Sequence, residues 1–305
     1  MIELEKLYTE KSNPASEQID TVSTLEMTRI INNEDKKVAQ AIECILPQIA
    51  AAIDLTAPAL RAGGRLFYIG AGTSGRLGIL DAVECPPTYG TDPQTIQGLI
   101  AGGYNAMFRA KEGSEDAKEL GEFDLKANNL TNSDVVIGLS ASGRTPYVLG
   151  GLAYASSIGA VTISIDCSPD SSISHYAQID LCALVGPEVI TGSTRMKAGT
   201  AQKMILNMLS TGIMIKLGKV YGNLMVDVKS SNEKLKERAL RIVMKAAGCN
   251  RETAIAALSK TNNNTKEAII AAALDISKQE ASSLLTACNG YVYLALQKKK
   301  RLHHD

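Results

Sequence analysis

Short apolar runs alternate with amphipathic segments through the middle of this chain. The apolar runs, which predict buried strands, are residues 65–70, 96–100, 134–139, 160–165 and 179–184. Helical patterns follow several of them, at residues 75–84, 105–120, 146–157 and 195–217. Apolar strands that alternate with helices are typical of a parallel sheet covered by helices on both faces. The pattern therefore predicts an α/β fold, an αβα sandwich with a five-stranded parallel sheet of the Rossmann-like or flavodoxin-like kind.

Helical patterns also precede this alternating region. Ser23 and Glu26 have the spacing of a capping box, which predicts a helix start. Periodic apolar positions extend the helical pattern through most of residues 34–62. We expect Pro47 and Pro58 to break or kink this helix.

Strand patterns stop toward the C-terminus, where short helices with their own start signals take over. Thr265 is one such start signal, and Ser277 and Glu280 form a second capping box. The sequence therefore predicts two domains. Residues 1–228 hold the sheet and the N-terminal helices, and residues 229–305 form a small bundle of three or four helices.

The balance of positive and negative residues argues against some classes of binding partner. Lys and Arg together number 32, as do Asp and Glu, so the formal net charge is zero. Proteins that bind nucleic acids or anionic membranes usually carry a basic excess. No apolar stretch approaches the ~20 residues of a transmembrane helix, and residues 1–6 lack the apolar core of a signal peptide. We expect neither a nucleic acid nor a membrane as a partner.

Cysteine and histidine offer little for a metal site or a disulfide framework. The six cysteines include no Cys-x-x-Cys pair, and the chain has three histidines. Cysteines without a pairing pattern suit a reducing compartment. These observations favour a cytoplasmic protein with no metal and no cofactor.

Two of the predicted strands run into loops rich in glycine, serine and threonine, and a helix follows each loop. The loops are residues 71–75 and 140–145. Each brings free N–H groups and the positive end of a helix dipole to one point, which is an anion site. Hydroxyls add neutral donors that suit a phosphate monoester, so the pair of loops predicts a small phosphorylated ligand. The candidate binding residues are Gly72, Thr73, Ser74, Ser140, Ser142, Gly143 and Thr145.

The first loop also matches the dinucleotide-binding fingerprint, through Gly70, Gly72 and Gly75. Such a site needs an acid at the end of the next strand, for the ribose, and residues 99–103 contain none. A dinucleotide would also leave the second loop unexplained. The alternative is that these glycines only make a tight turn from strand to helix.

A third helix start follows Gly192. Its candidates for ligand contact are Ser193 and Lys197, since a hydroxyl and a cation both favour an anion. The alternative is an ordinary N-cap by Ser193 or Thr194.

Two glutamates are candidates for acid–base chemistry. Glu84 is expected at the end of the helix 75–84, directly before Cys85-Pro86-Pro87. A carboxylate is poorly placed there for the helix dipole, although an exposed surface glutamate is the alternative. Glu115 is expected in the first turn of a helix, where the dipole favours any acid. Glu112 and Asp116 compete with Glu115 by the same local argument.

Long segments of the chain resemble the sugar isomerase (SIS) domain family, which binds phosphosugars. More narrowly, they resemble the N-acetylmuramic acid 6-phosphate etherase family and its relative, glucokinase regulatory protein. The segments that carry the resemblance are residues 9–16, 69–78, 81–88, 141–147, 186–194 and 221–227. The regulatory protein is much longer and has two SIS domains, whereas this chain has room for one. The resemblance therefore favours the etherase family.

This resemblance implies a flavodoxin-like SIS sheet and a carbon–oxygen lyase of cell-wall sugar recycling or catabolism. The D-lactyl ether of N-acetylmuramic acid 6-phosphate would be cleaved by elimination and hydration, giving N-acetylglucosamine 6-phosphate and D-lactate. Glu84 corresponds to the proton donor of the family and Glu115 to its base, with no cofactor. The resemblance also implies a homodimer and a C-terminal bundle of the ubiquitin-associated kind.

Two other functions stay open beside this one. An aldose–ketose isomerase would use the same loops and a carboxylate base. A phosphosugar sensor without activity would keep the loops and need neither glutamate. The Glu84-Cys-Pro-Pro segment favours the etherase over both.

Overall fold

The computed structural model describes residues 8–109, 111, 113–169, 171–228 and 232–302. The chain divides into two compact units. The first comprises Met1–Val83 and Pro93–Ser210, and the second comprises Glu84–Asp92 and Thr211–Asp305. The predicted domain boundary after residue 228 lies within the second unit.

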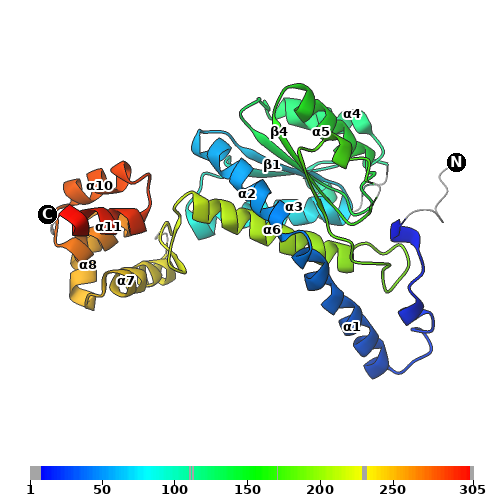
Figure 1. Ribbon diagram of the computed structural model, residues 1–305, viewed down its shortest axis with the longest axis horizontal. Coiled ribbons are helices and arrows are strands. Elements are labelled where there is room, and N and C mark those ends of the chain that lie inside the picture. The colour runs from blue at the N-terminus through cyan, green and yellow to red at the C-terminus, as the bar shows by residue number, and fades with distance from the viewer. Residues whose placement is uncertain (1–7, 110, 112, 170, 229–231, 303–305) are drawn as a thin grey trace. The chain divides into compact units, whose positions relative to one another are not determined.

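Five parallel strands form the sheet of the first unit (Figure 1). They are β1 (Leu66–Gly70), β2 (Ile96–Ile100), β3 (Val135–Leu139), β4 (Val161–Asp166) and β5 (Ile179–Cys182). Their order is β2-β1-β3-β4-β5, which is the flavodoxin-like order, and each neighbouring pair is parallel. Both β1 and β3 are buried at every position, which explains their continuous apolar sequence. The predicted sheet is confirmed.

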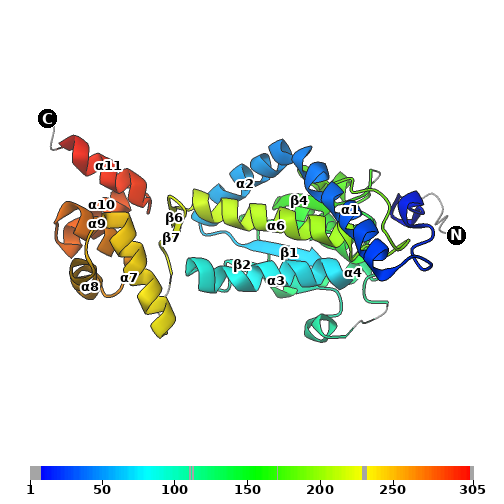
Figure 2. The same ribbon diagram turned by 90° about the horizontal axis from the view of Figure 1, so that it is seen from below.

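Helices cover both faces of this sheet (Figures 1 and 2). One face carries α4 (Lys118–Ala127) and α5 (Pro146–Ser157); the other carries α2 (Leu46–Arg61), α3 (Gly72–Tyr89) and α6 (Lys197–Lys216). Under α4 and α5 lies an apolar cluster of side chains from β1, β3 and the two helices. It includes Phe67, Ile69, Leu125, Val136 and Leu152, all fully buried.

In the described residues before α1 (Thr24–Glu43) lie the short 3₁₀ turns η2 (Tyr8–Glu10) and η3 (Pro14–Ser16). Ser23 caps α1, as its Oγ accepts the N–H of Glu26 at 3.2 Å. Pro47 lies in the first turn of α2 and so follows the break between α1 and α2, whereas Pro58 lies inside α2.

Within the described residues, no one helix has the length and apolar character to span a membrane. Only α1 and α2 taken together have both, as a pair bent by 59°.

Two helices differ from the prediction in ways that affect the site. The predicted helix 75–84 starts earlier and continues to Tyr89, with Pro86 and Pro87 inside it. Proline has a helical φ, so it fits a last turn, and Gly90 at φ 63° then ends the helix. The predicted helix 105–120 is instead a 3₁₀ turn, η4 (Tyr104–Met107), then a loop and α4. Gly113 has φ 76° in that loop, a conformation that a right-handed helix does not contain.

The second unit is mostly helical. Its elements are the hairpin β6 (Val220–Tyr221) and β7 (Leu224–Met225), then α7 (Glu233–Ala247), α8 (Arg251–Lys260), α9 (Thr265–Leu274), α10 (Lys278–Ala287) and α11 (Val292–Leu302). The bundle thus has five helices in its described part, not three or four. Its own apolar core includes Val243 and Ile269. The capping box of Ser277 is confirmed, but α9 is capped by Asn264 and not by Thr265.

Candidate active site

The first hydroxyl-rich loop joins β1 to α3 through a single residue, Ala71. A Cβ on Gly70 would lie 2.7 Å from the backbone N of Gly75, and a Cβ on Gly75 would lie 2.7 Å from the carbonyl O of Gly70. Only glycine fits at both positions, so these two residues make the tight strand-to-helix turn. The turn brings the first N–H groups of α3, and the positive end of its dipole, to the carboxyl edge of the sheet.

The second hydroxyl-rich loop joins β3 to α5 and is held together by its own side chains. The Oγ of Ser140 lies 2.8 Å from the Oγ1 of Thr145 and 3.4 Å from the Oγ of Ser142. Gly143 has φ 68°, and a Cβ there would lie 2.4 Å from the Oγ of Ser171. Because β1 and β3 are neighbours, the two loops lie side by side at the switch point of the sheet, where ligands bind in folds of this kind.

A cleft of about 350 Å³ lies between the two loops. Such a volume is at the small end of ligand sites. The lining comes from the loops, from η2, from the segment before α4 and from the segment before α6. The lining residues are Thr9, Glu10, Ala71, Gly72, Thr73, Ser74, Glu115, Asp116, Ala141, Ser142, Arg144, Thr145, Pro146, Gly192 and Thr194.

A second, smaller cavity of about 150 Å³ shares part of this lining. Three residues border both spaces: Ala71, Gly72 and Glu115. The rest of the smaller cavity is formed by Arg76, Ala101, Ala106 and Lys111.

Glu115 lies in the loop before α4 and has an exposed side chain. Its backbone carbonyl accepts the N–H of Tyr147 at 2.9 Å, which ties the loop to α5. It is therefore a loop residue, not a residue of the first helical turn. Its neighbour Asp116 lines only the larger cleft. The competing candidate Glu112 lies outside the described residues.

Comparison with known proteins decides the family. Residues 48–156 match the N-terminal SIS domain of glucokinase regulatory protein, residues 107–212 match the SIS domain, and residues 222–287 match the C-terminal lid domain of glucokinase regulatory protein. A curated protein named N-acetylmuramic acid 6-phosphate etherase, from Clostridium beijerinckii, is 58% identical over 97% of this chain and 97% of its own length. Another of that name, from Aliivibrio salmonicida, is 54% identical over 97% of this chain and 98% of its own length.

The chain belongs to the N-acetylmuramic acid 6-phosphate etherase family.

Solved structures are more distant from this etherase-family chain. A protein from Escherichia coli CFT073 has a TM-score of 0.48 and 18% identity, and the match covers 66% of this chain and 97% of that one. A phosphoheptose isomerase from Neisseria gonorrhoeae has a TM-score of 0.48 and 14% identity, with 63% and 98% covered.

The cleft of this etherase-family chain contains most of the predicted phosphate-binding residues. Those that line it are Gly72, Thr73, Ser74, Ser142 and Thr145, together with the candidate base Glu115. Ser140 and Gly143 do not line it, but they shape the second loop. Ser193, Lys197 and Glu84 do not line it either.

Ser74 reaches the cleft with its hydroxyl already engaged. Its Oγ donates to the Oε1 of Gln202 on α6 at 2.9 Å. Gln202 is 1% exposed, and its Nε2 has no hydrogen-bond partner among the described residues. If the amide turned over, Nε2 would donate to Ser74 and release the serine proton for a ligand oxygen. In the structure as it stands, the Ser74 proton is directed at Gln202.

At the third helix start, the N-terminus of α6, a side chain of the protein itself binds free N–H groups. The carboxylate of Glu188 accepts the backbone N–H of Lys197 and of Ala198, both at 2.9 Å, at the N-terminus of α6. The Lys197 ammonium lies 2.6 Å from the Oε2 of Glu34, with both side chains buried. Burial alone would raise the pKa of Glu34, but hydrogen bonds from Lys197, Lys37 and Asn13 outweigh it and hold this pKa at about 2. Lys197 thus has a carboxylate partner inside the fold.

Sequence reasoning missed four charged residues of the two cavities, Glu10, Arg76, Lys111 and Arg144. Glu10 lines the cleft, and its Oε2 lies 2.8 Å from the position of a Cβ on Gly192, so the carboxylate packs directly against that glycine. No local pattern indicates that role. Arg76 lines the smaller cavity, and here a signal exists. It is a cation one turn from the start of α3, where the helix dipole disfavours positive charge.

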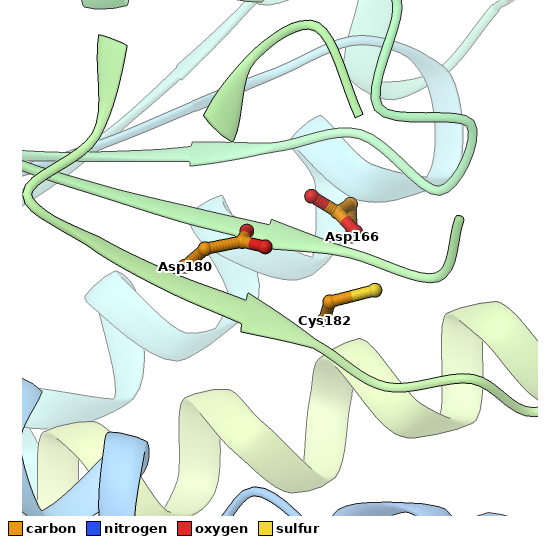
Figure 3. A group of neighbouring side chains, drawn as sticks. All are labelled: Asp166, Asp180 and Cys182. Carbon is orange, nitrogen blue, oxygen red and sulfur yellow. The ribbon is translucent and has the colours of Figure 1, made fainter. Parts of the chain in front are cut away.

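A separate group of donors lies on the last two strands of the sheet. Asp166 at the end of β4 and Asp180 and Cys182 on β5 place two carboxylates and a thiol within 4.8 Å of one another (Figure 3). Burial, with Asp180 adding to it, raises the pKa of Asp166 to about 7. The Oδ2 of Asp166 is buried and has no hydrogen-bond partner among the described residues. None of the three lines the cleft.

Proposed function

We propose that the cleft binds N-acetylmuramic acid 6-phosphate and that the protein cleaves the lactyl ether of this sugar. The observation that carries the proposal is the meeting of two hydroxyl-rich loops and the N-terminus of α3 at one cleft, in a chain of this etherase family. Thr73, Ser74, Ser142 and Thr145 supply donors to the phosphate oxygens there. Neutral donors and a helix dipole favour a dianion there, and Arg144, which lines the same cleft, adds a positive charge.

Glu115 is the base of the proposed reaction. In the open-chain sugar, the C1 aldehyde makes the C2 proton acidic, and the Glu115 carboxylate removes that proton. The electron pair forms the C2–C3 double bond, and the C3–O bond to lactate breaks. The lactate oxygen takes a proton from the general acid, for which we propose Glu84. Water then adds at C3 of the unsaturated aldehyde and gives N-acetylglucosamine 6-phosphate.

The position of Glu84 constrains how it takes part. It lies twelve residues after Gly72 in the same helix, which at 1.5 Å per residue is about 18 Å along the axis. Its own chain therefore does not bring it to the start of α3. Leu80 and Pro87, one turn before and one turn after it on the same face of α3, are also exposed, and so is Val83 beside that face. Leu80 and Val83 are 40% and 58% exposed. Apolar side chains that remain exposed on one helix face support a contact with another protein surface.

We propose a homodimer in which Glu84 serves the cleft of the partner subunit. Mixing two inactive variants tests this arrangement. In a random mixture of Glu84→Gln and Glu115→Gln subunits, half of the dimers are mixed, and each mixed dimer has one site with both glutamates intact. Activity should then return to about a quarter of the wild-type value. No recovery after subunit exchange would place both glutamates in one subunit or remove Glu84 from the site.

Release of D-lactate from N-acetylmuramic acid 6-phosphate tests the proposed reaction directly. The wild-type protein should release one D-lactate for each N-acetylglucosamine 6-phosphate that it forms. Conversion of an aldose phosphate to a ketose phosphate without lactate would instead support an isomerase. Binding of phosphosugars with no turnover would support a sensor. The proposed cytoplasmic location, in recycling of cell-wall sugars, fits a phosphorylated substrate, because its charge prevents passage through a bilayer.

A further inference from the structure

The smaller cavity differs from the cleft in the charge of its lining. Apart from Glu115, which borders both spaces, its polar side chains are the cations Arg76 and Lys111. The cleft instead combines the hydroxyls of its two loops with the carboxylates of Glu10, Glu115 and Asp116 and one cation, Arg144. A cavity of about 150 Å³ with two cations suits a small carboxylate rather than a whole sugar.

Arg76 has guanidinium N–H groups that make no hydrogen bond to the described part of the chain. Its Nε donates to the carbonyl of Met107 at 2.9 Å and its Nη2 to the carbonyl of Ala106 at 2.7 Å. These bonds anchor η4 and use one edge of the guanidinium, which has five N–H groups. The other edge, Nη1 with the second N–H of Nη2, makes no hydrogen bond to any described residue. No described carboxylate forms an ion pair with Arg76.

Lys111 reaches the same cavity across a glycine. Gly102 has φ 88°, and a Cβ there would lie 3.0 Å from the Cδ of Lys111. The absence of a side chain at Gly102 leaves room for the aliphatic part of Lys111. The lysine is exposed, and within the described chain its ammonium has no carboxylate partner.

We propose that the smaller cavity is the subsite for the carboxylate of the lactyl group, bound by the free edge of Arg76 and by Lys111. This inference rests on the proposed function. The substrate carries a phosphate at C6 and a lactyl carboxylate beyond the ether at C3, so it needs two anion sites that are joined. The two spaces meet at Ala71, Gly72 and Glu115. A substrate held at both ends therefore places C2 and the scissile C3–O bond at Glu115, between the two anchors.

Arg76 and Lys111 are accordingly specificity-determining residues. A 6-phosphosugar without the lactyl group fills the cleft but leaves both cations unpaired. Discrimination between the two kinds of phosphosugar then comes from the smaller cavity, and phosphate affinity comes from the cleft.

The test compares three ligands on a Glu115→Gln background, in which the substrate is expected to bind without turnover. The ligands are N-acetylmuramic acid 6-phosphate, its lactyl amide, and N-acetylglucosamine 6-phosphate. Dissociation constants are measured by calorimetry. We expect the amide to bind roughly tenfold more weakly than the acid, since it lacks the charge that the two cations bind. The amide tests the subsite without changing a residue of the cavity.

The second part of the experiment adds Lys111→Met, which leaves the hydrogen bonds between Arg76 and η4 in place. We expect it to weaken binding of the acid by roughly three- to tenfold and to leave N-acetylglucosamine 6-phosphate unchanged. The matched control is Lys118→Met, which removes the same charge from an exposed lysine outside both cavities. It should change neither affinity. Arg76→Lys, which keeps a cation but loses the bidentate edge, should weaken binding of the acid alone.

Each outcome decides between the two proposals. Equal affinity for acid and amide, or an equal loss of all three ligands in Lys111→Met, would overturn the carboxylate subsite and leave the etherase function standing. Failure of the wild-type protein to release D-lactate would overturn the proposed function, and the subsite with it.

Discussion

Replacing Lys197 by methionine tests whether this residue stabilises the folded protein or binds the ligand. Its ammonium lies 2.6 Å from the Oε2 of Glu34, and the two side chains are 1% and 4% exposed. Methionine keeps most of the stem but removes the charge. Glu34 then keeps two partners, the Lys37 ammonium at 2.6 Å and the Asn13 amide at 2.9 Å. The substitution therefore removes the most buried of the interactions that Glu34 makes.

The pKa of Glu34 sets the size of the effect. Burial raises the pKa of Glu34 and its partners lower it, with a net fall from 4.5 to about 2. That fall corresponds to about 3 kcal/mol net of the cost of burial. Breaking a buried ion pair usually costs about 3–5 kcal/mol, since the remaining charge stays buried. With Lys37 and Asn13 still in place, we expect Lys197→Met to lower the free energy of unfolding by about 2–4 kcal/mol.

Urea denaturation followed by circular dichroism measures this loss. The control is Lys37→Met, whose ammonium bonds the same carboxylate but whose side chain is 55% exposed. It should cost less than about 1 kcal/mol. The double variant Glu34→Gln with Lys197→Met should recover part of the loss, because no charge is left unpaired. Normal unfolding of Lys197→Met together with weaker binding of N-acetylglucosamine 6-phosphate would refute the structural role and restore the ligand role that the sequence suggested.

Three further predictions concern the cleft and the same buried carboxylate. Ser142→Ala and Ser74→Ala should each weaken phosphosugar binding by about 1–3 kcal/mol, and unchanged dissociation constants in both would remove the loops from the phosphate site. Glu115→Gln and Glu84→Gln should each lose ~10²–10⁴-fold in turnover. Exchange of the C2 proton with deuterated water should stop only in Glu115→Gln; normal exchange there would mean that another group, such as Asp116, is the base. Because the pKa of Glu34 is lowered in the folded state, its ionised form stabilises the fold above about pH 4.5, and that contribution is lost as the pH falls toward 2. Unfolding midpoints measured across that range should fall less steeply in Lys197→Met than in the wild type.

The phosphate loops could be predicted from the sequence because each is a local structure. A strand, a turn and a helix start that follow one another within a few residues are determined by neighbouring side chains. The glycines at 70 and 75 are required by the contact between their own backbones. Adjacent parallel strands then bring such loops together whatever the rest of the fold does. The helical character of the C-terminal bundle and the capping box of Ser277 were similarly local signals, although the number of helices was underestimated.

The sequence does not indicate a residue's environment where that environment depends on distant parts of the chain. A serine, a threonine and a lysine at the start of α6 look like a third anion site. The fold instead places the carboxylate of Glu188 on those N–H groups and brings Glu34 to Lys197. Nothing near Lys197 in sequence indicates that partner. Whether a helix N-terminus is open to a ligand is thus decided by the side chains packed against it.

Tertiary structure also decided how the carboxylates are distributed. The motif containing Glu84 is distinctive in the sequence, but a continuous α3 carries it about 18 Å from the first loop. Glu10 and Glu115, which have weak sequence signals, line the cleft because their segments fold back over the loops. The sequence by itself determined the sheet and the two hydroxyl-rich loops, because those depend on short-range backbone geometry. Which charges share a cavity was decided only by packing, since that depends on where segments far apart in the chain come together.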